Sequence, residues 1–374
     1  KMRRLFYLVV VVSLVACSSV KEKQEPTPLQ QINEVVELGK VESISLGGGD
    51  QTGLAPAVQD EVIATASAAG EVYLLDSELD QLWDVDLDRV ILGGTGLNST
   101  NVYVATADAK LVALARDDGA KVFEIVLPSS AVVPPVATDS LVFVKTQIGR
   151  ILAVNAQTGE TVWVEEAKES SVGIRGGSPM TLEGGTLFVL WGSGRIVAYR
   201  ADSGRIAWER QVAVSRGRSP LKRIVDSKGA PSVRQNRIVT ATRNGQVSVL
   251  DAGNGQLIWS LDSDAYPGAL LAFNSVIVVE TDGTISAYSA RSGDFLWANV
   301  ALKFRELSAP VVIDDFVAVV DLEGELHLLS PTTGAIVGRL DIGSGKGKVA
   351  PVVSDFGVLV QLLDGRLSLV EVIR

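Results

Sequence analysis

The sequence contains one cysteine, Cys17, and one histidine, His327, among 374 residues. A single cysteine excludes an internal disulfide and a thiolate metal cluster, and a single histidine argues against a histidine metal centre. Lys and Arg number 34 against 44 Asp and Glu, which does not favour binding to nucleic acid phosphates. The apolar stretch Leu5–Val15, interrupted only by Ser13, is too short for a membrane span of about 20 residues.

The N-terminal stretch has the pattern of an export signal. Lys1, Arg3 and Arg4 precede the apolar segment, which predicts a signal peptide over residues 1–16. The end of this segment, Leu14–Cys17, resembles a bacterial lipobox, which implies lipid attachment at Cys17 and removal of the preceding residues. An Asp after the cysteine usually marks inner-membrane retention, and the residue here is serine, so the resemblance implies the periplasmic face of the outer membrane. Residues 17–34 are predicted to form a lipidated N-terminus and a flexible polar tether.

A repeat with a period of roughly 40 residues organises the rest of the chain. Gly149–Trp163 combines a glycine, alternating apolar residues, a polar turn ending in glycine, and a short strand with tryptophan. Three further copies keep the same 14-residue spacing from Gly to Trp: Gly194–Trp208, Gly245–Trp259 and Gly283–Trp297. Weaker copies begin at Gly70, Ala109 and Gly324, and a half-copy begins at Gly365.

Each repeat unit is predicted to contain four short strands, which is typical of a β-propeller blade. The first strand follows a proline in six units, and the second is rich in β-branched residues. The eight predicted second strands are Val62–Ala66, Val102–Ala105, Leu141–Lys145, Leu187–Leu190, Ile238–Thr242, Val276–Glu280, Phe316–Val320 and Val358–Leu362. The eighth unit lacks a fourth strand, and Val35–Leu46 is predicted to supply it. We therefore expect an all-β, eight-bladed β-propeller of four-stranded antiparallel blades over residues 35–374, closed by its N-terminal strand.

The repeated tryptophans have two interpretations, a ligand-stacking surface or packing between blades. An aromatic residue at one offset in many repeats favours packing, because each blade must bury a large contact with its neighbour. The Gly that ends each polar turn, as in Thr158-Gly159, supplies the positive φ angle of a turn and is not a phosphate loop.

The unit G-x-[VIL]-x-A-[LVY]-x-A-x-[TS]-G-x-x-x-W resembles the pyrroloquinoline-quinone repeat of quinoprotein dehydrogenases, which indicates a fold and not a function. Together with the lipobox and tether, the eight units resemble the BamB family, the propeller lipoproteins of the outer-membrane β-barrel assembly machinery. The resemblance implies a non-enzymatic scaffold without a cofactor that docks on BamA, contacts other subunits and assists insertion of β-barrel proteins. Unfolded β-barrel clients, bound at exposed strand edges, are a further expected partner.

Two successive connections between blades carry the more particular match. In the first, Ser171–Pro179, the family has two apolar residues spaced i, i+2 and then an arginine that contact BamA. Val172, Ile174 and Arg175 occupy these positions, where the family usually has leucine at both apolar ones. Both connections should emerge on one face of the propeller as neighbours, and loops commonly carry binding residues.

In the second connection, Leu221–Pro231, the family has two acidic residues spaced i, i+2. Asp226 matches the first, and Lys228 reverses the charge at the second. Arg223 belongs to a basic cluster in the same stretch and is counted with the predicted BamA contacts. The alternative for both connections is a pair of solvated loops without a partner.

Two other function classes stay open on the sequence alone. A quinone-dependent dehydrogenase would need a vicinal cysteine pair and a calcium site of six to eight oxygens, and the sequence has no such pair and no suggestive acidic cluster. A propeller that binds envelope glycans is the third class.

Overall fold

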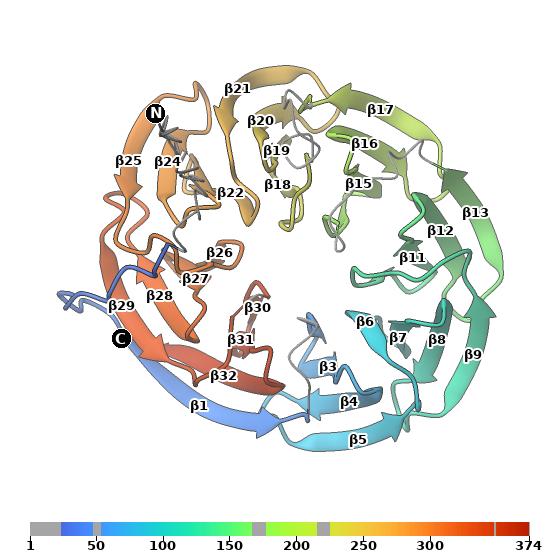
Figure 1. Cartoon of the computed structure of the whole chain (residues 1–374). Coiled ribbons are helices and arrows are strands. Elements are labelled where there is room, and N and C mark those ends of the chain that lie inside the picture. Colours follow the sequence, from blue (N-terminus) through green and yellow to red (C-terminus); the bar gives the residue numbers. More distant parts are fainter. Residues whose placement is uncertain (1–23, 48–53, 167–176, 215–224, 348, 374) are drawn as a thin grey trace, which may run out of the picture.

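The computed structural model describes residues 24–47, 54–166, 177–214, 225–347 and 349–373. Eight four-stranded antiparallel sheets, or blades, are arranged radially as a closed ring (Figure 1). The predicted number of blades, their strand count and their antiparallel pairing are confirmed. Within the described ranges no helix is long and apolar enough to cross a membrane.

The blades are numbered in chain order and their strands run from the inside of the ring outward. Blades one and two are formed by β2 (Ala57–Gln59), β3 (Val62–Ala66), β4 (Glu71–Asp76), β5 (Gln81–Asp86), and β6 (Ile91–Leu97), β7 (Asn101–Thr106), β8 (Lys110–Ala115), β9 (Lys121–Val126). Blades three and four are formed by β10 (Val136–Ala137), β11 (Leu141–Lys145), β12 (Arg150–Asn155), β13 (Thr161–Glu166), and β14 (Thr181–Glu183), β15 (Thr186–Leu190), β16 (Arg195–Arg200), β17 (Ile206–Gln211).

The second half of the ring repeats this arrangement. Blades five and six are formed by β18 (Ser232–Arg234), β19 (Arg237–Ala241), β20 (Gly245–Asp251), β21 (Leu257–Ser263), and β22 (Gly268–Ala272), β23 (Ser275–Val279), β24 (Ile285–Ser289), β25 (Phe295–Asn299). Blades seven and eight are formed by β26 (Val311–Ile313), β27 (Phe316–Val320), β28 (Glu325–Leu329), β29 (Ile336–Asp341), and β30 (Val352–Ser354), β31 (Gly357–Gln361), β32 (Arg366–Ile373), β1 (Glu37–Ser45). The predicted second strands match these bounds to within one residue at each end.

The N-terminal strand completes the last blade, as predicted. β1 runs antiparallel to β32, with Leu38 opposite Val372 and Ile44 opposite Leu367, and a bulge lies between Lys40 and Glu42. This pairing removes the free sheet edge that an open ring would leave.

The hydrophobic core lies between blades and not within them. Each of eight buried clusters combines residues of two neighbouring blades, as where Leu74 of β4 meets Val102 of β7. A single blade therefore cannot bury its apolar faces alone, and the ring is stabilised by contacts between neighbours.

The tryptophans pack between blades, which confirms the prediction. Each of the five outer-strand tryptophans lies against the turn glycine of the next blade and donates its indole N–H to a carbonyl of that turn. Trp208, for example, is 8% exposed and donates to Ala252 O at 2.8 Å. A Cβ at Gly255 would lie 2.4 Å from its ring, and the φ of this glycine is +70°. The close approach therefore requires glycine as much as the turn does.

The junction between blades eight and one uses a different pair of residues. In five blades the outer strand has tryptophan at a fixed position opposite the third strand. In blade eight this position is Glu42 of β1, which pairs with Leu369. The turn of the following blade has Leu79 in place of glycine, at φ 67° and 4% exposed. Leu79 belongs to the buried cluster of this junction, so its side chain fills space that no indole occupies.

Candidate partner-docking face

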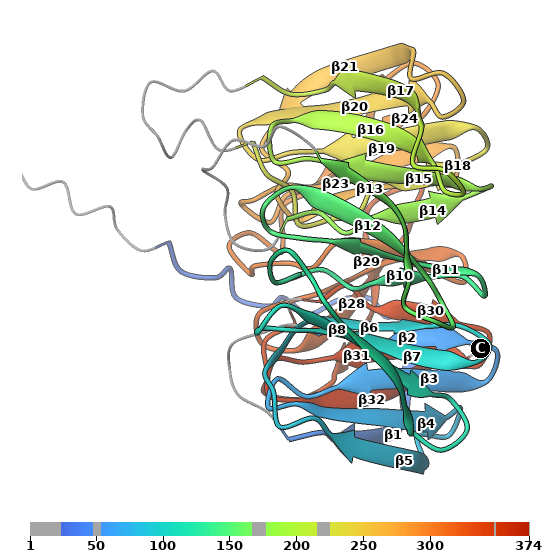
Figure 2. The same cartoon turned by 90° about the vertical axis from the view of Figure 1, so that its right-hand side faces the viewer.

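One face of the propeller carries the connections from the outer strand of each blade to the inner strand of the next. We call this the connection face; it includes residues 127–135, 177–180, 225–231, 300–310, 342–347 and 349–351. The opposite face carries the turns between the third and fourth strands, and β32 ends there (Figure 2).

A cavity of about 760 Å³ opens at the centre of the connection face, lined by the inner ends of several connections. Its lining includes Val133, Gly177, Gly229, Tyr266 and Pro351. The described ends of both predicted docking connections therefore lie at the rim of this cavity.

The structure brings the described ends of these two connections together, as predicted from their order in the ring. Ser178 Oγ donates to Gly229 O at 2.7 Å, and both residues are buried. Thr181 Oγ1 donates to Pro231 O at 2.6 Å. Two short hydrogen bonds thus join the first connection to the second at the points where each enters its blade.

A buried lysine fixes the end of the first connection. Lys145, at the end of β11, is 9% exposed and donates from Nζ to Ser178 O at 3.0 Å and Leu190 O at 3.1 Å. Its ammonium group also lies 5.1 Å from the centroid of the Trp191 ring, a cation–π arrangement. A buried charge is costly unless it is saturated with hydrogen bonds, so Lys145 stabilises one position of the Ser178 backbone.

Most of the predicted site residues lie outside the described residues: Cys17, Val172, Ile174, Arg175 and Arg223. Their roles in lipid attachment and partner binding therefore stay predictions. Asp226 is the one predicted contact that the structure describes.

Asp226 is only 4% exposed. Its Oδ1 accepts a hydrogen bond from Ser227 N at 2.8 Å, and its carbonyl oxygen accepts one from Arg243 N at 2.7 Å. Burial raises the pKa of Tyr266, and the negative charge of Asp226 raises it further, while the nearby Arg243 opposes the rise. The Asp226 carboxylate therefore forms a hydrogen bond within the second connection and lies close to Tyr266 and Arg243, with little of its surface exposed.

The central cavity does not fit a quinone cofactor with a calcium ion. Among its described lining residues no side chain is a carboxylate or a thiol, and the polar ones are Ser130, Gln147, Lys228 and Tyr266. Calcium needs six to eight oxygen ligands, commonly from carboxylates. The side chains that line the cavity therefore do not supply the calcium ligands that the dehydrogenase alternative requires.

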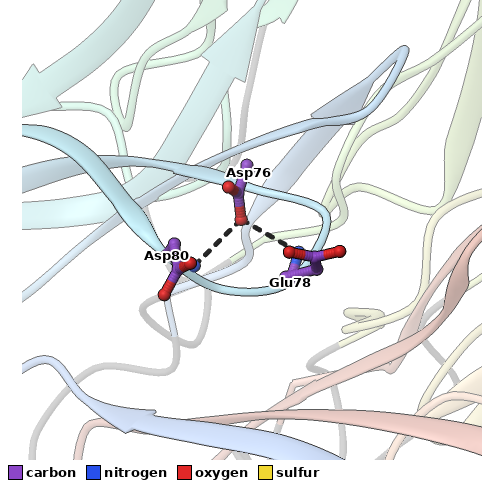
Figure 3. Close-up of side chains that lie close together, drawn as sticks. All are labelled: Asp76, Glu78 and Asp80. Carbon is purple, nitrogen blue, oxygen red and sulfur yellow. Dashed lines mark hydrogen bonds between the residues drawn. The ribbon is translucent and has the colours of Figure 1, made fainter.

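Three acidic side chains do lie close together, but on the turn of blade one. The ligand oxygens of Asp76, Glu78 and Asp80 lie within 4.8 Å of one another (Figure 3). Asp76 Oδ1 accepts hydrogen bonds from the backbone N–H groups of Glu78 and Asp80, each at 2.9 Å. Asp251 accepts from Gly253 and Asn254 in the same way in blade five, so the cluster is the ordinary chemistry of this turn.

Comparison with known proteins places this geometry in a family. The family model described as outer membrane protein assembly factor BamB matches residues 68–299 and 282–372. An outer membrane protein assembly factor BamB from Pseudomonas aeruginosa is 32% identical over 351 residues, covering 92% of each chain.

Two solved structures separate fold from function. The crystal structure of BamB from Moraxella catarrhalis superposes with a TM-score of 0.82 at 27% identity, covering 89% of this chain and 99% of that one. A quinohemoprotein alcohol dehydrogenase from Comamonas testosteroni gives 0.69 at 15% identity, covering 92% of this chain and 78% of that one, and shares the fold alone. The matched family, the similar propeller and a cavity unsuited to quinone chemistry agree: the chain belongs to the BamB family of non-enzymatic outer membrane protein assembly factors.

Proposed function

We propose that this assembly factor works as a subunit of the Bam complex, held by a lipid on Cys17 at the periplasmic face of the outer membrane. The connection face docks on the periplasmic region of BamA and so positions the propeller beside the machinery that inserts β-barrel proteins. Val172, Ile174 and Arg175 supply the apolar and cationic anchor, and Arg223 and Asp226 belong to the second connection.

The observation that carries this proposal is the link between the two connections. Ser178 is held by the buried Lys145 ammonium group on one side and by Gly229 O on the other. A loop whose base is fixed in this way loses less conformational freedom on binding, which favours affinity. Two such loops side by side on the connection face suit the docking of a protein partner, in which a buried arginine is a common binding hot spot.

Reversal of the charge at Arg175 tests the docking surface. Loss of a hot-spot arginine costs about 2 kcal/mol or more, which corresponds to about a thirtyfold weaker complex. We expect Arg175→Glu to reduce recovery of BamA with the affinity-tagged full-length lipoprotein from detergent-solubilised outer membranes, with an unchanged melting temperature. Arg291→Glu is the matched control, because Arg291 is exposed on the opposite face.

Undiminished recovery of BamA with Arg175→Glu would count against this docking surface. Recovery lost equally in both variants would point to overall charge and not to the connection face. Retention of the wild-type protein on envelope glycans, with no BamA bound, would favour the glycan-binding alternative.

A further inference from the structure

The chain segment before the first strand is bound along the outside of blade seven. Residues 24–36, here called the strap, run from the connection face along the outer strand β29 and lead into β1 (Figures 1 and 2). Thr27 N donates to Lys303 O at 3.0 Å on the connection face, and Val35 N donates to Val337 O at 2.8 Å at the start of β29. Leu29 packs against the buried cluster between blades six and seven.

Two arginines hold the strap by its backbone. Arg305 Nη1 donates to Thr27 O at 3.1 Å, and Arg339 Nη1 donates to Gln30 O at 3.0 Å. Both acceptors are main-chain carbonyls, so the contact depends on the path of the strap more than on its side chains. Such a contact leaves little signature in the polar sequence of this segment.

The two arginines belong to one buried polar network. Arg305 is 2% exposed and donates from Nε to Asp321 Oδ2 at 2.6 Å; it also pairs with Glu323. His327, fully buried, lies with Nε2 3.0 Å from the same Asp321 oxygen, and its Nδ1 accepts from Arg339 Nε at 3.2 Å. Because Nδ1 accepts, the proton of the neutral imidazole is on Nε2 and is donated to Asp321.

The charges around the imidazole keep this arrangement. Burial lowers the pKa of His327, the Asp321 carboxylate opposes this, and the positive charges of Arg339 and Arg305 add to the lowering. Burial would raise the pKa of Asp321, but hydrogen bonds from His327 and Arg305 hold it below its usual value. A buried network of this kind is stable only when its donors are saturated, and two of them are saturated by the strap.

Fixing Thr27 shortens the free part of the N-terminus. From Cys17 to Thr27 the chain can extend at most about 35 Å, at about 3.5 Å per residue. If the chain were free as far as Val35, the same calculation gives about 63 Å. The strap therefore keeps an anchor on Cys17 within about 35 Å of Thr27, which donates to Lys303 O beside blades six and seven.

We propose that the strap sets the orientation of the propeller on the membrane, with the rim of blades six and seven facing the lipid surface. The two docking connections join blades three to four and four to five, so they lie three and two blades away from this rim around the ring (Figure 1). A partner bound there meets a part of the ring that is two to three blades away from the anchored rim. This inference rests on the proposed lipid attachment at Cys17.

Two equivalent exposed valines allow a direct test. Val300 and Val126 each lie three residues after the outer-strand aromatic, at the connection-face end of blades six and two. These blades are opposite in the ring, and the two side chains are 57% and 77% exposed. Cys17 is the only natural cysteine, so in the acylated protein Val300→Cys or Val126→Cys provides the single thiol for a polarity-sensitive fluorophore.

The labelled full-length lipoproteins are inserted into vesicles of phosphatidylethanolamine and phosphatidylglycerol that contain headgroup-nitroxide lipid as quencher. We expect quenching at position 300 to be several-fold stronger than at position 126. The combined variant Leu29→Ser, Arg305→Ala and Arg339→Ala removes the apolar contact and both arginine contacts of the strap, and it should make the two positions equal. The exposed strap substitution Asn33→Ser is its control and should keep the difference.

Each outcome bears on the inference. Equal quenching in the wild type while the protein floats with the vesicles would overturn the orientation and leave the anchor intact. A difference that survives release of the strap would show that another contact orients the propeller and would overturn the role of residues 24–36. Failure to float with the vesicles would overturn the anchoring at Cys17 and the orientation together.

Discussion

The contact of Trp208 with Gly255 allows a quantitative test of how neighbouring blades are joined. Trp208→Ala removes a nearly buried indole and its hydrogen bond to Ala252 O. Burial of a tryptophan removes about 150–250 Å² from water, which at about 25 cal/mol per Å² is worth about 4–6 kcal/mol. Observed Trp→Ala costs are about 3–5 kcal/mol, and we expect a loss in this range from the free energy of unfolding in urea.

Gly255→Ala acts on the same contact from the other side. An alanine at φ +70° costs about 1–2 kcal/mol in backbone strain. Its Cβ would also lie 2.4 Å from the Trp208 ring, and overpacking of this kind costs about 1–3 kcal/mol more. In the Trp208→Ala background the overlap is gone and only the backbone cost remains, so the double variant should be less destabilised than the sum by about 1–3 kcal/mol.

Gly184 provides the matched control for the backbone part. Its φ is +53°, and a Cβ there would meet nothing within 4 Å. Gly184→Ala should therefore cost about 1–2 kcal/mol equally in the wild-type and Trp208→Ala backgrounds. Strict additivity of Trp208→Ala with Gly255→Ala would refute the view that the glycine is required by the indole.

Three further predictions concern ring closure and pH. Deletion of residues 35–46 should lower the melting temperature sharply because β32 loses its partner, and an unchanged midpoint would disprove closure by β1. Because the pKa of His327 is lowered in the folded protein, neutral His327 contributes its full stabilisation above its ordinary pKa near 6.5. As the pH falls below 6.5 this stabilisation is lost, by at most about 1.4 kcal/mol per pH unit. The melting temperature of His327→Gln should therefore change less between pH 7 and pH 5 than that of the wild type, as measured by thermal melts. Hydrogen bonding from Lys110 and the charge of Arg89 lower the pKa of Glu124 to about 2, so its stabilisation is present above about pH 4.5 and lost from there toward pH 2. Thermal melts of Glu124→Gln should show less change over that acid range, and an equal change would remove Glu124 as its source.

The periodic part of the fold could be predicted because its signals are local. A glycine, alternating apolar residues and a tryptophan at fixed spacing specify three strands and two turns. The same pattern recurs in successive units along the chain. In the six units with a recognised proline, that proline stands 14 or 15 residues before the glycine of the repeat. Pro267 stands directly before β22 but 16 residues before Gly283, so the inner strand of blade six was not recognised from its proline. The third strand begins one residue after the residue that opens the repeat in six blades, two residues after Gly283 in blade six, and at Gly245 itself in blade five. In most blades the opening residue therefore belongs to the turn.

The contacts outside the repeat could not be predicted in this way. The strap has the polar composition of a tether, and its first described residues are instead held by main-chain hydrogen bonds that any sequence can form. The network around His327 joins residues from a connection, a turn and two strands, so no single spacing reveals it. For the docking surface, sequence order correctly predicted that the described ends of the two connections adjoin, but the burial of Asp226 results from tertiary packing and was not predicted.

The pairing of β1 with β32 has a consequence for the order in which the molecule can be made. In chain order β1 precedes the other seven sheets and β32 follows them, so those seven sheets can form from nearby segments before the eighth can be completed. Contacts between such distant segments are slow to form because a long chain must be brought together first. A product that stops before Arg366 would leave β1 without its sheet partner and the ring open, so closure of the ring depends on synthesis of β32.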